Sequence, residues 1–292
     1  MKENAIHTVV IIGAGNVATH LAMALYQAEV NISQVISRNP ESAEKLSELV
    51  HAGFTTDWKE LDTGADLYIL SVPDDVIPEI LDKNLWKDKI LVHTAGSVSL
   101  DIFKNYTDFY GVFYPLQTFS KNKEVDFSQI PLCIEANSQG VFNNLEELAS
   151  KISERIYHVN SEQRQKLHLS AVFACNFTNH LWSISEQLLN EDRLGFEMIK
   201  PLIGETYHKA MKQSPYQAQT GPALRNDQNT LKKHEKALEK HPELKKLYTE
   251  LCLALCFKKR LPHGHYYRGK YRCGKNTLPK AWSRRYLHAI IQ

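Results

Sequence analysis

Residues 9–18 carry the small side chains that allow a protein backbone to contact a diphosphate. Val9–Ile12 form an apolar run, and Gly13-Ala14-Gly15-Asn16-Val17-Ala18 then follows the spacing Gly-x-Gly-x-x-Ala. Gly13 permits a tight turn, Gly15 lets the backbone approach a pyrophosphate, and Ala18 lets the next helix pack closely. Free N–H groups at the helix start face the anion. We predict dinucleotide binding by residues 13–17; a chance glycine turn between strand and helix is the alternative.

The residues after the second strand, expected at 32–37, bear on the choice of nicotinamide cofactor. An Asp or Glu at this place accepts hydrogen bonds from the adenine ribose and repels a 2′-phosphate. This chain has Ser37, Arg38 and Asn39 there, and a guanidinium fork suits a phosphate. The sequence therefore favours NADP over NAD. In the alternative interpretation Arg38 is a solvated residue before a helix start at Asn39-Pro40.

Two further strands end in short polar loops that belong at the same sheet edge. The strand expected at 65–72 runs into Ser71-Val72-Pro73, and the strand at 90–93 ends in Thr94-Ala95-Gly96. Loops at the carboxyl edge of a parallel sheet line the ligand crevice, so we predict that both loops contact the cofactor. His93 is a candidate acid or base, or a buried histidine bonded to backbone. Asp74 and Asp75 are expected to cap the next helix.

A long, mostly apolar helix is expected from Ser161 or Arg164 to Leu189, at the centre of the second half of the chain. Its polar residues mostly recur at spacings of four, seven and eight, which places them along one stripe. They are His168, Cys175, Asn176, Asn179 and His180. We interpret the stripe as a patch facing the nicotinamide, with His168 and Asn176 as catalytic candidates. Polar residues satisfied inside a helical or dimer interface are the alternative.

A rigid turn in the second half brings an arginine to a helix start. Gly221-Pro222 is followed by Arg225 and Asp227. An arginine in this position can clamp a carboxylate substrate or a phosphate. A structural pair between Arg225 and Asp227 is equally compatible with the pattern.

Alternating strands and helices must position these residues in the first half. Strands expected at 110–114 and 131–135 continue the series, and such alternation indicates a parallel sheet. Beyond residue 160 the pattern changes to long helices. The fold class predicted is α/β, an N-terminal doubly wound Rossmann sheet followed by an all-α domain. The predicted domains are 1–160 for the dinucleotide, 161–257 for substrate binding or dimerisation, and a basic tail at 258–292.

Composition indicates an ordinary globular protein. Of the 292 residues 43% are apolar and 23% charged, and the chain shows no leader pattern and no apolar run long enough for a membrane span. We expect a cytoplasmic protein that does not bind membranes. The five cysteines lack framework spacing, which favours free thiols in a reducing compartment.

The end of the chain departs from this composition. Residues 251–292 hold ten Lys and Arg without an Asp or Glu, so the first 250 residues carry a charge of −8. Nucleic-acid contact by these basic and tyrosine residues is one interpretation, and an unrelated extension or shifted reading frame is the favoured one. The Cys and His spacing matches no usual zinc pattern, so no metal site is predicted.

Five motifs together resemble a known group, the Rossmann-like proteins that carry a DUF2520 helical domain. The motifs are Gly13–Ala18, Ser71–Asp74, His93–Ser97, His168 with Ala171–Phe177, and Thr220–Ala223 with Arg225 and Asp227. The resemblance covers about residues 5 to 250. The group is similar to pyrroline-5-carboxylate reductase and to the 3-hydroxyacid and 6-phosphogluconate dehydrogenases. It implies NADP- or coenzyme F420-dependent oxidoreductases without a settled substrate, with a helical domain that usually forms a homodimer.

The sequence departs from the hydroxyacid dehydrogenases at one place. Those enzymes use a lysine about one turn before an asparagine on the long helix, where this chain has Val172 and Phe173. We therefore expect His168, and after it His93, to supply the proton in hydride transfer. The hypothesis is an NADP-dependent oxidoreductase acting in an interdomain cleft on a small imine, ketone or alcohol whose carboxylate lies near Arg225. NAD and coenzyme F420 stay open as cofactors, and a non-catalytic NADP sensor or scaffold is the alternative function.

Overall fold

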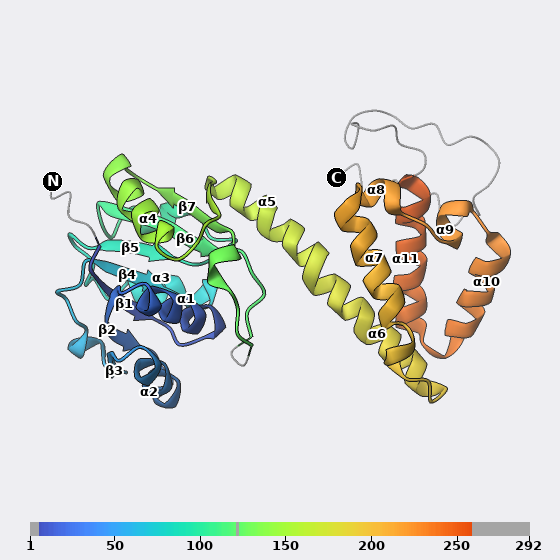
Figure 1. The fold of residues 1–292 in the computed structure, drawn as a ribbon, viewed down its shortest axis with the longest axis horizontal. Helices are drawn as coiled ribbons and strands as arrows, with labels where there is room; N and C mark the ends of the chain where they lie inside the picture. Colours follow the sequence, from blue (N-terminus) through green and yellow to red (C-terminus); the bar gives the residue numbers. More distant parts are fainter. Residues whose placement is uncertain (1–5, 121–122, 259–292) are drawn as a thin grey trace. The chain divides into compact units, whose positions relative to one another are not determined.

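The structure, a computed structural model, describes residues 6–120 and 123–258 (Figure 1). The chain separates into two compact units, residues 1–193 and 194–292. The predicted domain boundary at 160/161 coincides with the start of helix α5 (Ser161–Ala171), whereas the boundary between the compact units lies at 193/194. The functional domains 1–160 and 161–257 remain a prediction. The basic tail beyond residue 258 lies outside the described residues, and so do the hypotheses about it.

The first unit is built on one eight-stranded sheet with the order β3-β2-β1-β4-β5-β6-β7-β8. The chain runs from β1 outward to β2 and β3, then returns to place β4 on the other side of β1. This reversal creates a crevice at the carboxyl ends of β1 and β4, where α/β proteins bind ligands. The strands are β1 (Thr8–Ile12), β2 (Asn31–Ile36), β3 (Gly53–Thr55), β4 (Leu67–Leu70), β5 (Ile90–His93), β6 (Phe109–Pro115), β7 (Leu132–Ala136) and β8 (Ile156–His158).

Every neighbouring pair of strands is parallel except β6 and β7, which are antiparallel. The prediction of an α/β fold with a doubly wound Rossmann sheet followed by helices is confirmed, with this exception to a fully parallel sheet. No α-helix lies between β6 and β7 in the described residues; only the short 3-10 helix η4 (Phe127–Gln129) does. The chain is therefore not carried back across the sheet, and β7 begins at the edge where β6 ends.

The sheet is buried on both faces, which explains its continuous apolar strands. Val9 and Ile11 of β1 contribute to one apolar cluster, and Val10 and Ile12 contribute to the other. Side chains alternate along a strand, so a strand covered on both faces has no polar positions. The first cluster includes helices α1 (Asn16–Gln27), α2 (Pro40–Leu49) and α4 (Gln139–Ser150), and the second includes α3 (Ile77–Leu81) and η3 (Leu100–Phe103).

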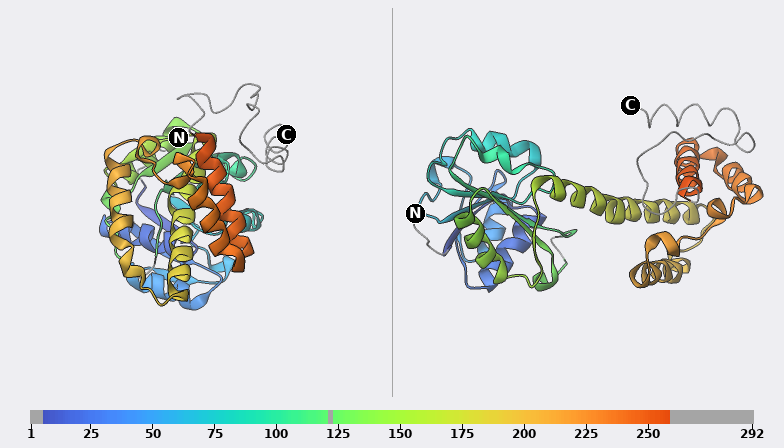
Figure 2. Two further views of the ribbon diagram at one scale, coloured as in Figure 1. Left: turned by 90° about the vertical axis from the view of Figure 1, so that its right-hand side faces the viewer. Right: turned by 90° about the horizontal axis from the view of Figure 1, so that it is seen from above.

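One long helical rod follows β8 and belongs to the first unit (Figure 2). It consists of α5 (Ser161–Ala171), the π-helical segment η5 (Val172–Phe177) and α6 (Thr178–Glu191). A π turn bonds residue i to i+5, so the predicted stripe of polar residues at α-helical spacing does not continue through η5. The expectation of a central, covered helix also fails in the single chain, because Phe173, Phe177 and Trp182 are exposed.

The second unit is a small group of helices. The described helices are η6 (Phe196–Met198), α7 (Lys200–Lys212), α8 (Pro215–Ala218), α9 (Pro222–Arg225), α10 (Gln228–Ala237), η7 (Leu238–Lys240) and α11 (Pro242–Lys258). The Cys256 thiol bonds the Ala223 carbonyl at 3.2 Å and ties α11 to α9. Ala223 is the one buried residue among the described side chains of this unit. This unit therefore has little core of its own.

The described cysteines, Cys133, Cys175, Cys252 and Cys256, are all free, as predicted. Cys273 lies outside the described residues. None of the described helices has both the length and the apolar composition required to cross a membrane.

Candidate functional site

Gly13 and Gly15 open the turn between β1 and α1, and they do so for different reasons. Gly13 has φ +112°, and a Cβ built there would lie 2.2 Å from the Ser71 carbonyl oxygen of the neighbouring strand end. Gly15 has an ordinary φ of −81°, and a Cβ built there would meet nothing within 4 Å. Gly13 is thus required by the fold, whereas the space above Gly15 is open to a ligand.

Helix α1 begins at this turn without a side-chain cap. Its N-cap is Gly15, no side chain accepts a hydrogen bond from its first turn, and no acidic residue lies in that turn. The first N–H groups of a helix have no partner inside the helix, and the helix dipole favours an anion beside them. The sequence therefore leaves this helix start free to bind a phosphate, as the motif predicts.

A cavity of about 280 Å³ lies at the crevice between β1 and β4. Nine of the predicted cofactor residues line it: Gly13, Ala14, Gly15, Ser37, Arg38, Asn39, Ser71, Val72 and Pro73. The sequence interpretation missed other residues of the lining, namely Ile12, Ile36, Ser42, Thr56, Trp58, Val76, Glu79 and Ile80. Thr56 follows β3 at the same sheet edge, a signal that could have been used. The segment 76–80 follows β4 in the same way.

The end of β2 presents one unpaired cation to this cavity. Arg38 is exposed and takes part in no ion pair among the described residues. The Asn39 Oδ1 atom accepts the Ser42 N–H at 2.9 Å and caps α2, so its oxygen is engaged in the fold. The Ser37 hydroxyl accepts the Asn39 N–H at 3.4 Å. The one acidic residue of the cavity is Glu79, which comes from α3 rather than from the end of β2.

Five of the predicted cofactor residues do not line the cavity, and two of them, Asn16 and Val17, belong to α1. The Asn16 side chain donates to the Phe119 carbonyl at 3.0 Å, and Val17 is half-buried. His20, one turn further along α1, bonds the Ser120 carbonyl at 2.9 Å and stacks on Phe119. The side chain of Asn16 thus holds the segment after β6 against α1 and is not part of the cavity lining.

The loop after β5 lies beside the β4 end and beneath a histidine of α5. The Thr94 hydroxyl donates to the Ser71 hydroxyl at 3.2 Å, which joins the two loops. A Cβ built on Gly96 would lie 2.6 Å from the His168 ring. Gly96 is therefore close to His168, and none of Thr94, Ala95 and Gly96 lines the cavity. Asp74 caps no helix, contrary to expectation; it accepts a hydrogen bond from Ser97 instead.

His168 is paired with a tyrosine at the end of β6. Its Nδ1 atom lies 3.0 Å from the Tyr114 hydroxyl. Tyr114 is buried, and burial is the main cause that raises its pKa to about 12. The phenol therefore stays protonated at neutral pH and offers a neutral partner to the imidazole. The sequence interpretation missed Tyr114, although a tyrosine at the carboxyl end of a buried strand was a usable signal.

His93 lies in a different environment from His168. Its side chain is 0% exposed, its Nδ1 accepts the Ala95 N–H at 3.2 Å, and its ring packs on Phe103. Burial, followed by the charge of Arg164, lowers the pKa of His93 to about 3. The imidazole is therefore neutral at physiological pH, with its proton on Nε2, and lies beneath the loop.

Asn176 and Arg225, the other two catalytic candidates, lie on separate elements. Asn176 is exposed in η5, eight residues beyond His168. Arg225 is exposed at the end of α9, in the second unit. It forms no ion pair with Asp227 among the described residues; Asp227 caps α10 by accepting the Thr230 N–H at 3.1 Å. Hydrogen bonds from Thr230 are the main cause that lowers the Asp227 pKa.

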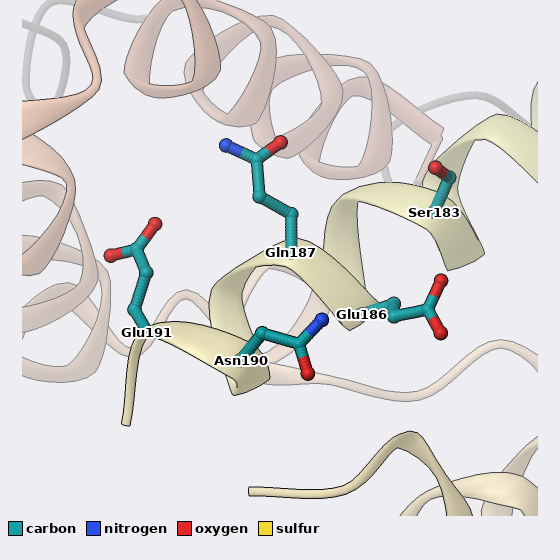
Figure 3. Close-up of a pocket in the computed structure, with 5 residues that line it drawn as sticks. All are labelled: Ser183, Glu186, Gln187, Asn190 and Glu191. Atoms are coloured by element: carbon teal, nitrogen blue, oxygen red, sulfur yellow. The ribbon is translucent and has the colours of Figure 1, made fainter. Parts of the chain in front are cut away.

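A second hollow, of about 470 Å³, lies on α6 and is lined by Ser183, Glu186, Gln187, Asn190 and Glu191 (Figure 3). All five residues come from one helix, so the hollow has a single wall. Its larger volume does not make it the better site. The described residues also contain no group of three or more His, Cys, Asp and Glu side chains arranged to hold a metal ion.

Two family models match the chain. The family of NADP oxidoreductases that are coenzyme F420-dependent matches residues 8–96, and the domain of unknown function DUF2520 matches residues 130–255. No curated protein matches the chain in sequence.

Several solved structures resemble the protein along most of its length. One, described as a "putative NADP oxidoreductase" from Bacteroides fragilis, is 42% identical with a TM-score of 0.79, over 87% of this chain and 99% of that one. A protein from Thermotoga maritima is 23% identical with a TM-score of 0.72, over 87% and 100% of the two chains. An imine reductase from Myxococcus stipitatus in complex with NADP+ shares the fold at 15% identity and a TM-score of 0.61, over 87% and 93%.

The similarity to the Bacteroides fragilis structure covers 87% of this chain at 42% identity. The chain therefore belongs to the family of Rossmann-fold NADP oxidoreductases that carry a DUF2520 domain.

Proposed function

We propose that the protein binds NADP(H) in the crevice between β1 and β4 and reduces a small imine or ketone, with His168 as the proton donor. The carrying observation is that the His168 ring lies over Gly96 and 3.0 Å from the Tyr114 hydroxyl, at the sheet edge that holds the glycine turn. An alcohol would be the substrate of the reverse reaction.

The residues present fit the cofactor. The open space above Gly15 and the uncapped start of α1 suit a pyrophosphate. Arg38, with the Ser37 hydroxyl beside it, suits a 2′-phosphate, and no carboxylate follows β2. These features support NADP over NAD. Coenzyme F420 remains a candidate because the family that matches residues 8–96 includes it by name.

The chain's contribution to the chemistry is to hold and deliver a proton. Bound NADPH supplies the hydride. In this proposal, when both ring nitrogens of His168 carry a proton, the Nδ1–H group donates to the Tyr114 oxygen and the Nε2 proton is the one transferred to the oxygen or nitrogen of the substrate. His93 is excluded from this role because its pKa of about 3 keeps it neutral.

Two observations bear on the class of substrate. The shared fold with an imine reductase supports a C=N or C=O substrate, and Arg225 supports one that bears a carboxylate. Asn176 is the second polar candidate on the helical rod. The alternative, an NADP sensor or scaffold without catalysis, is supported by Val172 and Phe173 at the place of the dehydrogenase lysine.

A second copy of the chain is the proposed partner of the helical half. Met198 and Leu202 are each 67% exposed, and Met211 is 65% exposed, although the second unit has little core. Exposed apolar surface of this extent is typical of a protein interface. Dimerisation through these helices would cover it. The cytoplasmic location remains a prediction.

Titration with NADPH, NADH and reduced F420 tests the cofactor assignment. Arg38→Ala is expected to weaken NADPH binding by roughly 10- to 100-fold and to leave NADH binding unchanged, since it removes a charged hydrogen-bond donor to the 2′-phosphate. Equal effects on both cofactors would refute the role of Arg38. Binding of none of the three by a folded sample would refute the proposal itself.

Turnover of NADPH with a panel of keto acids and cyclic imines tests the reaction. His168→Ala is expected to lower kcat by roughly 100-fold or more, the usual size of a general acid's contribution. Arg225→Ala is expected to raise KM for carboxylate-bearing substrates alone. Unchanged turnover in His168→Ala would remove this residue from the mechanism, and tight NADPH binding without turnover of any substrate would favour the sensor.

A further inference from the structure

Arg164 is a fully buried cation at the start of the helical rod. Its side chain is 0% exposed and forms an ion pair with Glu135 of β7. The same guanidinium bonds the Val98 carbonyl, and its Nη2 lies 3.2 Å from the Ser161 hydroxyl. The N–H donors of a guanidinium lie in one rigid plane. The bonds from Arg164 therefore fix the positions of Glu135, Val98 and Ser161 relative to one another.

Glu135 completes the tie from the side of the sheet. Its carboxylate accepts the Ser161 N–H and the Ser161 hydroxyl, each at 2.8 Å. The Ser161 hydroxyl oxygen in turn accepts the Leu100 N–H at 2.9 Å. Glu135 lies opposite Val112 of β6 in the strand register. The first turn of α5 is therefore fastened both to the sheet and to the segment that follows the β5 loop.

His168 lies one helical turn beyond Arg164, on the same face of α5. The face that Arg164 buries is thus the face that presents His168 to Gly96 and Tyr114. The space for the ring is narrow, because a single Cβ on Gly96 would already overlap it. A small shift of α5 would therefore lengthen the 3.0 Å contact between His168 Nδ1 and the Tyr114 hydroxyl.

We infer that Arg164 and Glu135 are positioning residues that hold His168 against Tyr114 and Gly96. The inference rests on the proposed function for what His168 then does, but the positioning itself is independent of turnover. The pair is suited to this task because its side chains are 0% and 15% exposed. Separating the two side chains would leave a buried charge without its counter-ion. Any position of the start of α5 that moves Arg164 away from Glu135 is therefore disfavoured.

The experiment measures the reactivity of His168 with diethyl pyrocarbonate in the full chain, by mass spectrometry. The tryptic peptide 167–193 also contains His180, an exposed histidine that serves as an internal control. Glu135→Gln and Arg164→Lys are expected to raise the modification rate of His168 by roughly 3- to 10-fold, the equivalent of one lost hydrogen bond, while the rate at His180 stays unchanged. Tyr114→Phe is expected to reproduce this increase.

The matched control is Glu146→Gln, which removes an exposed carboxylate that pairs with His158 on the surface. It is expected to leave His168 at the wild-type rate. An unchanged His168 rate in folded Glu135→Gln and Arg164→Lys, or an equal rise at His180, would overturn the inference. If these two variants fail to fold, Ser161→Ala removes the shared hydroxyl alone; an unchanged His168 rate there would also overturn it.

The NADPH affinity of the same variants separates this inference from the proposed function. The cavity at Gly15 contains neither Arg164 nor Glu135, so NADPH binding is expected within about twofold of wild type. Failure of the wild-type protein to bind NADPH would count against the proposed function and would leave the His168 result standing.

Discussion

The two glycines of the turn between β1 and α1 differ in whether the fold itself requires them. Gly13 and Gly15 lie two positions apart in one motif. A side chain at Gly13 meets the backbone of the next strand, whereas one at Gly15 enters open space. The same motif therefore contains one glycine that the fold requires, Gly13, and one beside open space, Gly15.

Matched alanine substitutions should separate these roles. Gly13→Ala is expected to destabilise the protein by about 1–3 kcal/mol or more, because φ +112° is strained for alanine and its Cβ overlaps the Ser71 carbonyl. Gly15→Ala should leave the urea midpoint unchanged and weaken NADPH binding at least tenfold. Loss of stability in Gly15→Ala, or normal stability in Gly13→Ala, would contradict this assignment.

His93 should make the stability of the protein depend on pH. Its pKa is about 3 in the folded chain and near 6.5 when unfolded, so the imidazole is neutral in both states above pH 6.5. As the pH falls below 6.5, the unfolded chain binds a proton that the folded chain excludes. Stability is then lost by up to about 1.4 kcal/mol per pH unit.

The measurement compares urea unfolding of the wild type and His93→Gln between pH 7 and pH 4.5. Glutamine does not titrate, so the variant is expected to lose stability less steeply as the pH falls, whatever its stability at pH 7. Parallel curves for the two proteins would show that His93 titrates normally.

Two helices of the first unit begin with the same type of N-cap but lie at different distances in the fold from the cavity at Gly15. Asn39 caps α2 at the cavity, and Asn160 caps α5 through a reciprocal capping box with Gln163. Each asparagine oxygen accepts an N–H at 2.9 Å. The two caps are chemically alike, but only the first belongs to an element that borders the cavity at Gly15.

Asn39→Ala and Asn160→Ala are each expected to cost about 1 kcal/mol in the free energy of unfolding, the usual loss for an N-cap. Only Asn39→Ala should also weaken NADPH binding, because it moves the start of α2 beside Arg38. Fluorescence titration with NADPH provides the comparison. A weaker affinity in Asn160→Ala would mean that the start of α5 acts on the cavity.

At the scale of the whole molecule, the two units differ in how they are stabilised. The first unit has a sheet buried on both faces, whereas the described part of the second has a single buried residue. A helical unit with this little core needs further apolar contacts. This contrast is the physical basis for the proposed homodimer.

Light scattering after size exclusion tests the dimer. Leu202→Glu is expected to shift the protein from dimer to monomer, because Leu202 is 67% exposed in the second unit. Leu49→Glu is the matched control, since Leu49 is 46% exposed on α2 of the first unit and should not affect assembly. A monomeric wild type, or a dimeric Leu202→Glu, would argue against this interface.

Local patterns in the sequence were sufficient for most elements and for the cavity. The predicted strand at 90–93 agrees with β5 residue for residue, and nine predicted cofactor residues line one cavity. Less local features were missed. The antiparallel β7 and the π turn at 172–177 each depend on contacts that periodicity does not report.

By itself, the sequence determined the Rossmann turn, the order of strands and helices and the cation after β2, because each depends on neighbouring residues. Only the tertiary structure decided that His168 meets Tyr114 and that Arg164 meets Glu135, pairs that lie 54 and 29 residues apart. It also decided that His93 is buried and neutral. Such contacts depend on how strands are ordered in the sheet and where the first turn of α5 is fastened, and no local pattern encodes either.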